Sequence, residues 1–291
     1  MTRLFFLCLL LFQALSLQAA PVYVEHDWLA KNMANKDVIV LDMTADNVQY
    51  LRFHIPGAIR LSYQDIVTKR KRDKVSVRIN DGQLVTLLGN LGVTNKHHVV
   101  IYDDMGGLDA GRLFWELERI GHSKVSVLRG GLVKWVLAGH KVDNKPEKKL
   151  PTTYKKNGRG RDNEALLDDI KQDNATTLLD VRSLEEFVGH PRYPRTGRIP
   201  GAKWWPWENN VDFDNGFVPK NNQTLQLALN NIGVNNKDMP LTLYCRSGHR
   251  ASQSYLTLRD LGYTNVKLYD ASMAEYSQQR DLPLEKGRKT N

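Results

Sequence analysis

The sequence predicts an α/β protein built from two tandem copies of one domain, each with a central parallel sheet flanked by helices. Short apolar runs of strand length alternate with segments whose apolar residues recur at helical spacing. A set of short motifs also occurs twice along the chain in the same order. The length of 291 residues favours two domains over one.

The tetrapeptide Ile-Pro-Gly-Ala marks the repeat most clearly, because it occurs at 55–58 and again, about 140 residues later, at 199–202. Other short motifs pair in the same order: 40–42 with 178–180, 91–93 with 232–234, 99–103 with 241–245, Gly121 with Gly262, and 125–127 with 266–268. So many matches in one order indicate two copies of one domain rather than chance.

Strands and helices are expected at matching places in the two copies. In the first copy, the expected strands are 38–43, 98–104 and 125–128. One helical face between the last two strands is formed by Ala110, Leu113, Phe114 and Leu117. The equivalent face in the second copy is formed by Ala251, Tyr255, Leu258 and Leu261. This alternation implies parallel sheets covered on both faces.

The predicted boundaries follow from the repeat and from local composition. We expect an N-terminal domain at 21–142, a linker at 143–162 and a C-terminal domain at 163–291. The linker is rich in Lys, Pro and Gly and lacks any periodicity.

The first twenty residues differ from the rest of the chain. Arg3 precedes an apolar run at 4–12, and small residues end at Ala19 and Ala20. This pattern is typical of a secretory signal peptide, whereas a membrane anchor needs about 20 apolar residues in a row. We therefore predict export, to the periplasm, with no stable membrane insertion after cleavage near Ala19 or Ala20. Pro21 leaves the cleavage position open.

The chain is basic, with a net charge of +9. Its densest cationic run is 69–72, which is typical of a solvated loop. Nucleic-acid binding needs more than one such run, so no nucleic-acid partner is expected. A basic field favours small anionic substrates.

Cysteine usage points to one reactive thiol. The chain has two cysteines, and Cys8 lies in the segment expected to be removed. Cys245 would then be the single thiol of the mature chain. A lone thiol is either a small buried hydrophobe or a nucleophile.

The segment around Cys245 favours the nucleophile. An apolar strand ends at Cys245, a polar loop with Gly248 follows, and a helix begins near Arg250. Backbone N–H groups of such a loop and the positive end of the helix dipole both favour a thiolate. Side chains of Arg246, His249 and Arg250 would add charge or hydrogen-bond donors, and the thiolate is the reactive form.

Loop length separates sulfur transfer from phosphate chemistry. Cysteine phosphatases place an arginine six positions after the nucleophile, and that position here is Ala251. The basic residue comes one position earlier, at Arg250. This smaller loop suits one sulfur atom better than a phosphate group.

Three features together resemble the rhodanese family, in particular its tandem-domain thiosulfate or mercaptopyruvate sulfurtransferases. They are the strand end at 179–182 followed by Glu186 and Phe187, the run Gly-Arg-Ile-Pro-Gly-Ala at 197–202, and the loop from Cys245 to Arg250. The resemblance covers nearly all of the chain beyond the signal segment. It implies that each domain is a doubly wound α/β unit and that Cys245 alternates between thiolate and persulfide.

The resemblance also implies a set of site residues. Arg246, Ser247, Gly248, His249 and Arg250 form the active-site loop. Arg182 matches an arginine that contacts the anionic donor in family members. Asp180 would orient the loop arginines, or be only a strand-end carboxylate. His249 would donate to the bound anion, or be an exposed loop histidine.

The first domain is expected to be catalytically inactive. Asp103 stands where the first copy would hold its nucleophile, and 104–107 replace the basic loop. A carboxylate cannot accept a transferable sulfur in this way. Asp103 and Asp104 are therefore expected to cap a helix, while the domain supports the fold or supplies one wall of the active-site cleft.

The sequence leaves the sulfur donor open. Arg246 points to thiosulfate, because family members that use 3-mercaptopyruvate usually have glycine after the cysteine. Ser247 weakens that assignment, because some thiosulfate enzymes have lysine there. Arg192 and Arg195 would reach a donor anion or lie in a solvated loop. The cluster of Trp204, Trp205 and Trp207 would line the cleft or pack in the core.

These features predict a sulfurtransferase that passes sulfur to cyanide, a thiol or a thioredoxin-like partner, with no cofactor and no metal. The alternatives are a sulfur-relay module with little turnover, a phosphatase, and a thiol oxidoreductase, which would lack a second cysteine to resolve a mixed disulfide.

Overall fold

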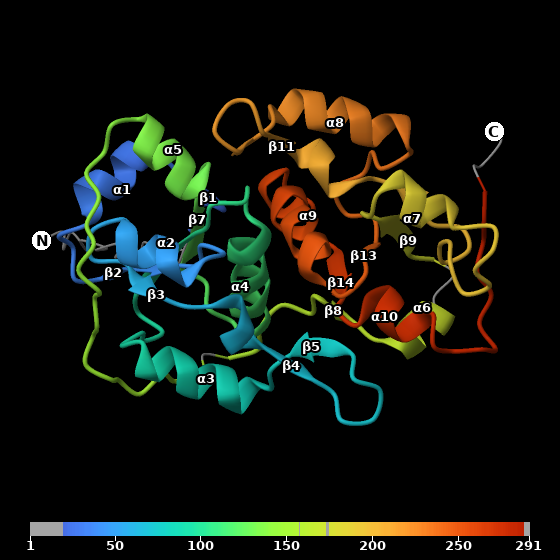
Figure 1. Cartoon of the computed structure of the whole chain (residues 1–291), viewed down its shortest axis with the longest axis horizontal. Helices are drawn as coiled ribbons and strands as arrows, with labels where there is room; N and C mark the ends of the chain where they lie inside the picture. Colours follow the sequence, from blue (N-terminus) through green and yellow to red (C-terminus); the bar gives the residue numbers. More distant parts are fainter. Residues whose placement is uncertain (1–19, 157, 173–174, 288–291) are drawn as a thin grey trace, which may run out of the picture.

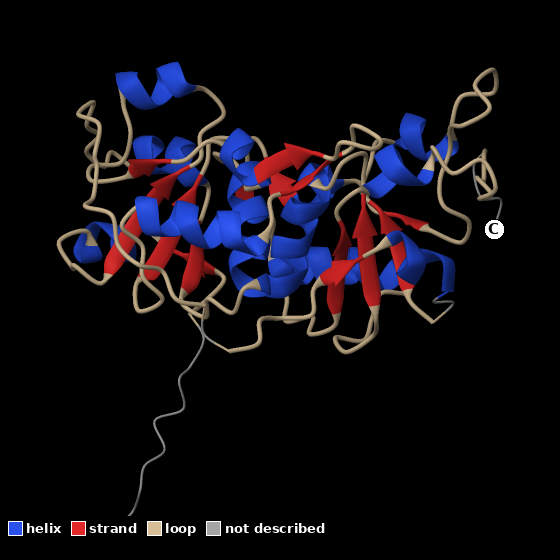
Figure 2. Ribbon diagram, turned by 90° about the horizontal axis from the view of Figure 1, so that it is seen from below, coloured by secondary structure: helices blue, strands red, loops and turns tan. Residues whose placement is uncertain are grey.

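Two parallel sheets form the frame of the molecule, and helices pack between and outside them (Figures 1 and 2). The computed structural model describes residues 20–156, 158–172 and 175–287. The expected signal peptide and Cys8 lie outside the described residues, except for Ala20. Among the described residues no helix is long and apolar enough to cross a membrane.

The first domain has five parallel strands in the order β1-β7-β6-β2-β3. The strands are β1 (Tyr23–Val24), β2 (Val38–Asp42), β3 (Ile59–Arg60), β6 (His98–Tyr102) and β7 (Val125–Leu128). The helices are α1 (His26–Asn32), α2 (Asn47–Arg52), α3 (Asp81–Asn90), α4 (Leu108–Arg119) and α5 (Gly131–Leu137). Apolar runs therefore form the strands where the sequence predicted them.

The second domain repeats this arrangement strand for strand. Its sheet has the order β8-β14-β13-β9-β10. The strands are β8 (Glu164–Ala165), β9 (Thr177–Asp180), β10 (Lys203–Trp204), β13 (Leu241–Tyr244) and β14 (Val266–Tyr269). The helices are α6 (Leu167–Gln172), α7 (Leu184–Val188), α8 (Asn222–Asn231), α9 (His249–Asp260) and α10 (Ser272–Tyr276). The predicted fold class of two tandem α/β domains is confirmed.

A matched hydrogen-bond cluster explains why the same motifs recur. In the second domain the Tyr244 hydroxyl accepts from the backbone N–H of Ile199 at 3.1 Å. In the first domain the Tyr102 hydroxyl accepts from the backbone N–H of Ile55 at 3.1 Å and donates to Asp42. The tyrosine that ends one strand thus holds the Ile-Pro-Gly-Ala turn in each copy.

Helices α4 and α9 lie side by side at the centre of the molecule (Figure 1). They come close because Gly111 has no side chain, and a Cβ there would lie 2.9 Å from the carbonyl oxygen of Ser252. The largest buried apolar cluster runs through both helices and includes residues of both sheets. Smaller clusters lie under α1 and α5 in the first domain and under α6 and α10 in the second.

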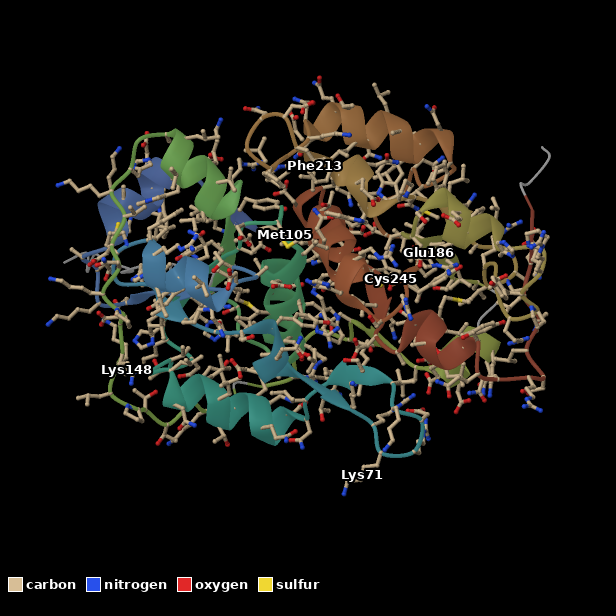
Figure 3. All side chains as sticks on the ribbon, in the orientation of Figure 1. Lys71, Met105, Lys148, Glu186, Phe213 and Cys245 are labelled. Carbon is tan, nitrogen blue, oxygen red and sulfur yellow. The ribbon has the colours of Figure 1, made fainter. Side chains whose placement is uncertain are left out.

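A hairpin from the first domain reaches the second domain. It consists of β4 (Val67–Lys69) and β5 (Ser76–Arg78), and it carries the basic run 69–72. Lys71 lies at its tip (Figure 3), whereas Arg70 and Arg72 pair with Glu275 of the second domain. The run is therefore only partly a solvated loop, because two of its cations join the domains.

Short elements complete the two domains. They are the 3-10 helices η1 (Tyr63–Ile66) and η2 (Trp207–Asn210) and the antiparallel pair β11 (Val211–Asp212) and β12 (Val218–Pro219). The segment 143–162 has no helix or named strand in its described part and runs along the first domain. There the backbone N–H of Thr152 donates to Gly89 at 2.8 Å, and Tyr154 is buried.

Candidate active site

Cys245 lies at the carboxyl end of β13, immediately before α9 (Figure 3). It is a free thiol with 1% of its surface exposed. Its backbone N–H donates to the Ser272 hydroxyl at 3.1 Å, and its carbonyl accepts from Met273 at 3.2 Å. These two hydrogen bonds attach the start of the loop to the first residues of α10.

Gly248 makes the tight turn from this loop into α9. Its φ is +80°, and a Cβ there would lie 2.4 Å from a carboxylate oxygen of Asp270. Only glycine suits both the left-handed backbone and the close approach. The turn places Cys245 at the positive end of the α9 dipole, which favours a negative sulfur.

The backbone N–H groups of Arg246, Ser247 and Gly248 have no acceptor among the described residues. Three free donors in one loop form an anion-binding nest next to the thiol. A backbone N–H group that is buried without an acceptor costs free energy. These three N–H groups are therefore available to donate to a bound anion or to solvent.

The two loop arginines differ in how far their charges are compensated. Arg250 donates two hydrogen bonds to Glu186, at 2.6 and 3.0 Å. Burial opposes ionisation of Glu186, but Arg250 outweighs it and lowers the pKa of that carboxyl. Arg246 is exposed and forms no ion pair with any residue that the structure describes. Arg246 is therefore the uncompensated cation of the loop.

His249 is held by the first domain. Its Nε2 lies 2.5 Å from a carboxylate oxygen of Asp109, at the start of α4. Its ring packs against Tyr63, with 4.5 Å between ring centroids. The histidine is therefore not a free loop side chain, because Asp109 and Tyr63 of the first domain both contact it.

A buried ion pair connects the first domain to the underside of the loop. The Arg112 guanidinium on α4 donates to Asp270, which also accepts from the backbone N–H of Arg78 at 2.7 Å. Arg112 is fully buried and Asp270 is 4% exposed. Burial disfavours the charge on Arg112, but Asp270 and Glu116 outweigh it and raise its pKa. Since Asp270 lies against Gly248, the Arg112–Asp270 pair helps to fix the position of the loop.

Asp180 and Arg182 lie together, apart from the loop arginines. Arg182 donates to Asp180 at 2.8 and 2.5 Å and to the carbonyl of Gly197 at 2.8 Å, and it is 5% exposed. In the described contacts Asp180 orients Arg182 rather than Arg246 or Arg250. Two of the three Arg182 nitrogens thus donate to protein acceptors, and the contact of Arg182 with a donor anion stays a prediction.

The other residues considered from sequence have mainly structural surroundings. Arg195 donates to the carbonyls of Ser277, Gln279 and Leu282 at 2.6 to 3.0 Å, and thereby fixes the segment after α10. Arg192 is exposed. The indole of Trp205 is buried and donates to Asn210 at 2.9 Å.

The two other tryptophans of that cluster remain partly exposed. Trp204 donates to the carbonyl of Arg182 at 2.9 Å, and Trp207 packs edge-on against Phe213. Only Trp205 is therefore placed in the core.

The first-domain loop has the same kind of nest, but its own carboxylate fills it. Asp103 accepts from the backbone N–H groups of Met105, Gly107, Asp109 and Ala110 at 2.9 to 3.1 Å. Burial and the nearby Asp109 raise the pKa of Asp103 to about 6, although these backbone donors act in the opposite direction. Asp103 thus caps α4, and it occupies the space where a reactive sulfur would lie.

We expect Asp103→Ala to lower the free energy of unfolding by about 3 kcal/mol, because four backbone N–H groups, three of them in buried hydrogen bonds, lose their acceptor. Urea titration at pH 8, where the carboxylate is ionised, measures this loss. Asp104→Ala is the matched control, since Asp104 accepts one hydrogen bond, from Ala45 at 3.0 Å. Equal losses in the two variants would contradict the capping role.

Several site residues could not be found from sequence. Tyr63, Asp109 and Arg112 reach the loop only because the two domains pack together. Asp270 belongs to the second domain, but its pairing with Arg112 depends on the same packing. The spacing of Asp109, Arg112 and Glu116 placed them on one helical face, but a charged face is equally typical of a solvated one. Among the described residues no group of His, Cys, Asp and Glu side chains is arranged to bind a metal ion.

Comparisons with known proteins agree with this arrangement. The family model of the rhodanese-like domain matches twice, at 25–138 and 162–279. The chain is 32% identical over 278 residues to a protein of Mycobacterium bovis named "Putative thiosulfate sulfurtransferase 1", covering 91% of this chain and 98% of that protein. It is 32% identical over 283 residues to the sulfur carrier protein TtuD of Thermus thermophilus, covering 91% and 97%.

Solved structures share the fold. An anaerobic ergothioneine biosynthesis enzyme from Chlorobium limicola superposes with a TM-score of 0.80 at 23% identity, over 92% of this chain and 70% of that chain. YnjE superposes with a TM-score of 0.77 at 20% identity, over 92% and 68%. With two matched domains and relatives similar over nearly their whole length, the chain belongs to the rhodanese family of sulfurtransferases, as a tandem-domain member.

Proposed function

We propose that this protein takes a sulfane sulfur from a small anionic donor, with thiosulfate favoured over 3-mercaptopyruvate, and passes it through a Cys245 persulfide to a thiophilic acceptor. The observation that carries the proposal is the contrast between the two loops. The nest of the first domain holds the Asp103 carboxylate, whereas the nest of the second domain surrounds a thiol and has free donors.

The proposed cycle has two displacement steps. In the first, the Cys245 thiolate attacks the outer sulfur of thiosulfate, the sulfur–sulfur bond breaks, and sulfite leaves with the electron pair. In the second, cyanide or a thiolate attacks the outer sulfur of the persulfide, and the Cys245 thiolate leaves. Since the donor product departs before the acceptor reacts, the kinetics should be ping-pong.

The electrostatics of the loop favour this cycle. A persulfide and a thiosulfate both carry negative charge at the sulfur that moves, and the free N–H groups and the α9 dipole stabilise such charge. Hydrolysis of a phosphate ester needs a guanidinium that can bind the phosphate oxygens. Both terminal nitrogens of Arg250 instead donate to Glu186. This contact favours sulfur transfer over phosphatase activity.

Arg246 supports the preference for thiosulfate, because it is a free cation beside the thiol. We expect Arg246→Gly to raise the KM for thiosulfate about tenfold, as expected for loss of one exposed charged contact with a dianion. Initial rates of thiocyanate formation measure it. Arg192→Gly, which removes an exposed arginine of another loop, should leave that KM unchanged. An unchanged KM in Arg246→Gly would remove the support for thiosulfate.

A sulfur-relay function is the second candidate, because one of the similar proteins is named a sulfur carrier protein. A relay would form the persulfide but turn over slowly with free acceptors. Purified protein incubated with thiosulfate and cyanide distinguishes the two. Steady thiocyanate production with parallel double-reciprocal plots supports the enzyme, whereas a persulfide without turnover supports the relay.

The acceptor and the place of action belong to the same proposal. A thiol or a thioredoxin-like protein is the proposed natural acceptor, because the thiolate chemistry of the second step suits it. The signal-like segment 1–20 supports action in the periplasm.

A further inference from the structure

Tyr63 reaches the active-site loop from the catalytically inactive domain. It begins the helical turn η1, which a capping box fixes: the Ser62 hydroxyl accepts from Gln64, and the Asp65 carboxylate accepts from the backbone N–H of Ser62. The Tyr63 ring packs on His249, which in turn binds Asp109. The position of the ring is therefore fixed in two ways, by the backbone turn that carries Tyr63 and by its contact with His249 of the loop.

The hydroxyl of Tyr63 has no hydrogen-bond partner among the described residues, although it lies among charged groups. The charges of Arg112, Asp270, Cys245 and Asp109 all act on it. Burial raises its pKa to about 12, with Asp270 and Cys245 adding to the rise and Arg112 opposing it. The phenol thus stays protonated at neutral pH and keeps an O–H donor to offer.

We propose that the Tyr63 hydroxyl is a catalytic hydrogen-bond donor to the sulfur at Cys245, and that it binds the outer sulfur of the persulfide. This inference rests on the proposed function. The first domain holds Asp103 at the place that Cys245 takes in the second, but it would supply this donor across the interface.

The proposed role fits both displacement steps without any net proton transfer. During attack on thiosulfate, negative charge moves from Cys245 to sulfite while the outer sulfur becomes bonded to Cys245. The resulting persulfide carries its charge on the outer sulfur, where the O–H donates. When the acceptor removes that sulfur, the charge returns to Cys245. The O–H bond of Tyr63 stays intact throughout, so no further reactant is required.

Tyr63 differs from the side-chain donors of the loop itself, of which Arg246 is free but exposed and cationic. Arg250 is bound by Glu186 and His249 by Asp109, so neither side chain is free to follow the sulfur. The free backbone donors are fixed in the loop itself. Tyr63 is the neutral side-chain donor that faces the loop from the opposite domain.

Tyr63→Phe tests the proposal, because it removes the hydroxyl and keeps the ring on His249. We expect the second-order rate of persulfide formation with thiosulfate to fall tenfold to a hundredfold, about the effect of one hydrogen bond to a charged group. The rate is followed by quenching and intact-protein mass spectrometry. The thermal unfolding midpoint should stay within about 2 °C of the wild type, because little apolar packing is lost. Tyr193→Phe, at an exposed tyrosine, should change neither quantity.

The outcomes separate this inference from the proposed function. If the wild type forms the persulfide and Tyr63→Phe forms it at a rate within twofold, the role of Tyr63 is overturned. A rate loss accompanied by a matching loss of thermal stability would also overturn it, since the residue would then be structural. If the wild type forms no persulfide, the proposed function itself fails.

Discussion

Cys245→Ser should lower sulfur transfer from thiosulfate to cyanide by at least about 10⁴-fold, to the background of the assay. A serine hydroxyl is not ionised at neutral pH and cannot hold a sulfane sulfur as a persulfide. The side chain is nearly the same size and can accept hydrogen bonds from the loop. The free energy of unfolding should therefore change by less than about 1.5 kcal/mol. Thiocyanate formation and urea titration measure the two quantities.

Cys8→Ser is the matched control for this variant, because Cys8 is the other cysteine of the chain. It should retain the full rate. Substantial activity in Cys245→Ser, or an equal loss in Cys8→Ser, would show that the sulfur travels through another group.

Arg112→Met should destabilise the folded protein by about 3 to 5 kcal/mol at pH 8, the cost of leaving the buried Asp270 carboxylate without its cation and Glu116 with Arg119 alone. Arg112 is fully buried between Asp270 and Glu116, with Arg112 and Glu116 on the same face of α4. Methionine fills a similar volume, so the loss reports mainly on charge. Activity should fall as well, because Asp270 would present an unpaired negative charge beneath Gly248, close to the reacting sulfur.

The loss in Arg112→Met should depend on pH in a defined direction. Burial raises the pKa of Glu116 to about 7 from the ordinary 4.5, even with Arg112 and Arg119 acting to lower it. A carboxyl with a raised pKa destabilises the folded state above that pKa, and the penalty disappears below the unfolded value. Loss of Arg112 should raise the pKa of Glu116 further, so the part of the deficit that comes from Glu116 should shrink as the pH falls from 8 to below about 7.

Arg72→Met provides the control, since Arg72 likewise joins the two domains by an ion pair, with Glu275, but its side chain is 73% exposed. Such an exposed pair contributes less than about 1 kcal/mol, so this variant should remain near wild-type stability. If Arg112→Met were as stable as Arg72→Met at pH 8, the buried pair would not hold the domains and the loop in place.

The elements that depend on local pattern could be predicted from the sequence. Apolar runs located β2, β6 and β7, and the apolar face at 110–117 located α4. The paired motifs also predicted two domains of one kind. In the structure the motifs have one role, since Tyr102 and Tyr244 bind the same turn in each copy. These features arise from neighbours in the chain or from repetition, and both are visible in one sequence.

The contacts across the domain interface could not be predicted, because they depend on how α4 meets α9. Asp109 and His249 are 140 positions apart, and no local pattern relates them. Arg182 shows the converse limit. Its place after a strand-end aspartate suggested a donor contact, but the sequence could not show that Asp180 and the carbonyl of Gly197 accept from its Nε and one terminal nitrogen. The expected Cys245 loop was visible in sequence, whereas the walls around it were not.

The most direct test of sulfur transfer through Cys245 is the mass of the protein after exposure to thiosulfate. We expect a gain of one sulfur atom that maps to the peptide containing Cys245, disappears on addition of cyanide, and is absent from Cys245→Ser. A protein that gains no sulfur, or gains it on a peptide without Cys245, would contradict the central claim.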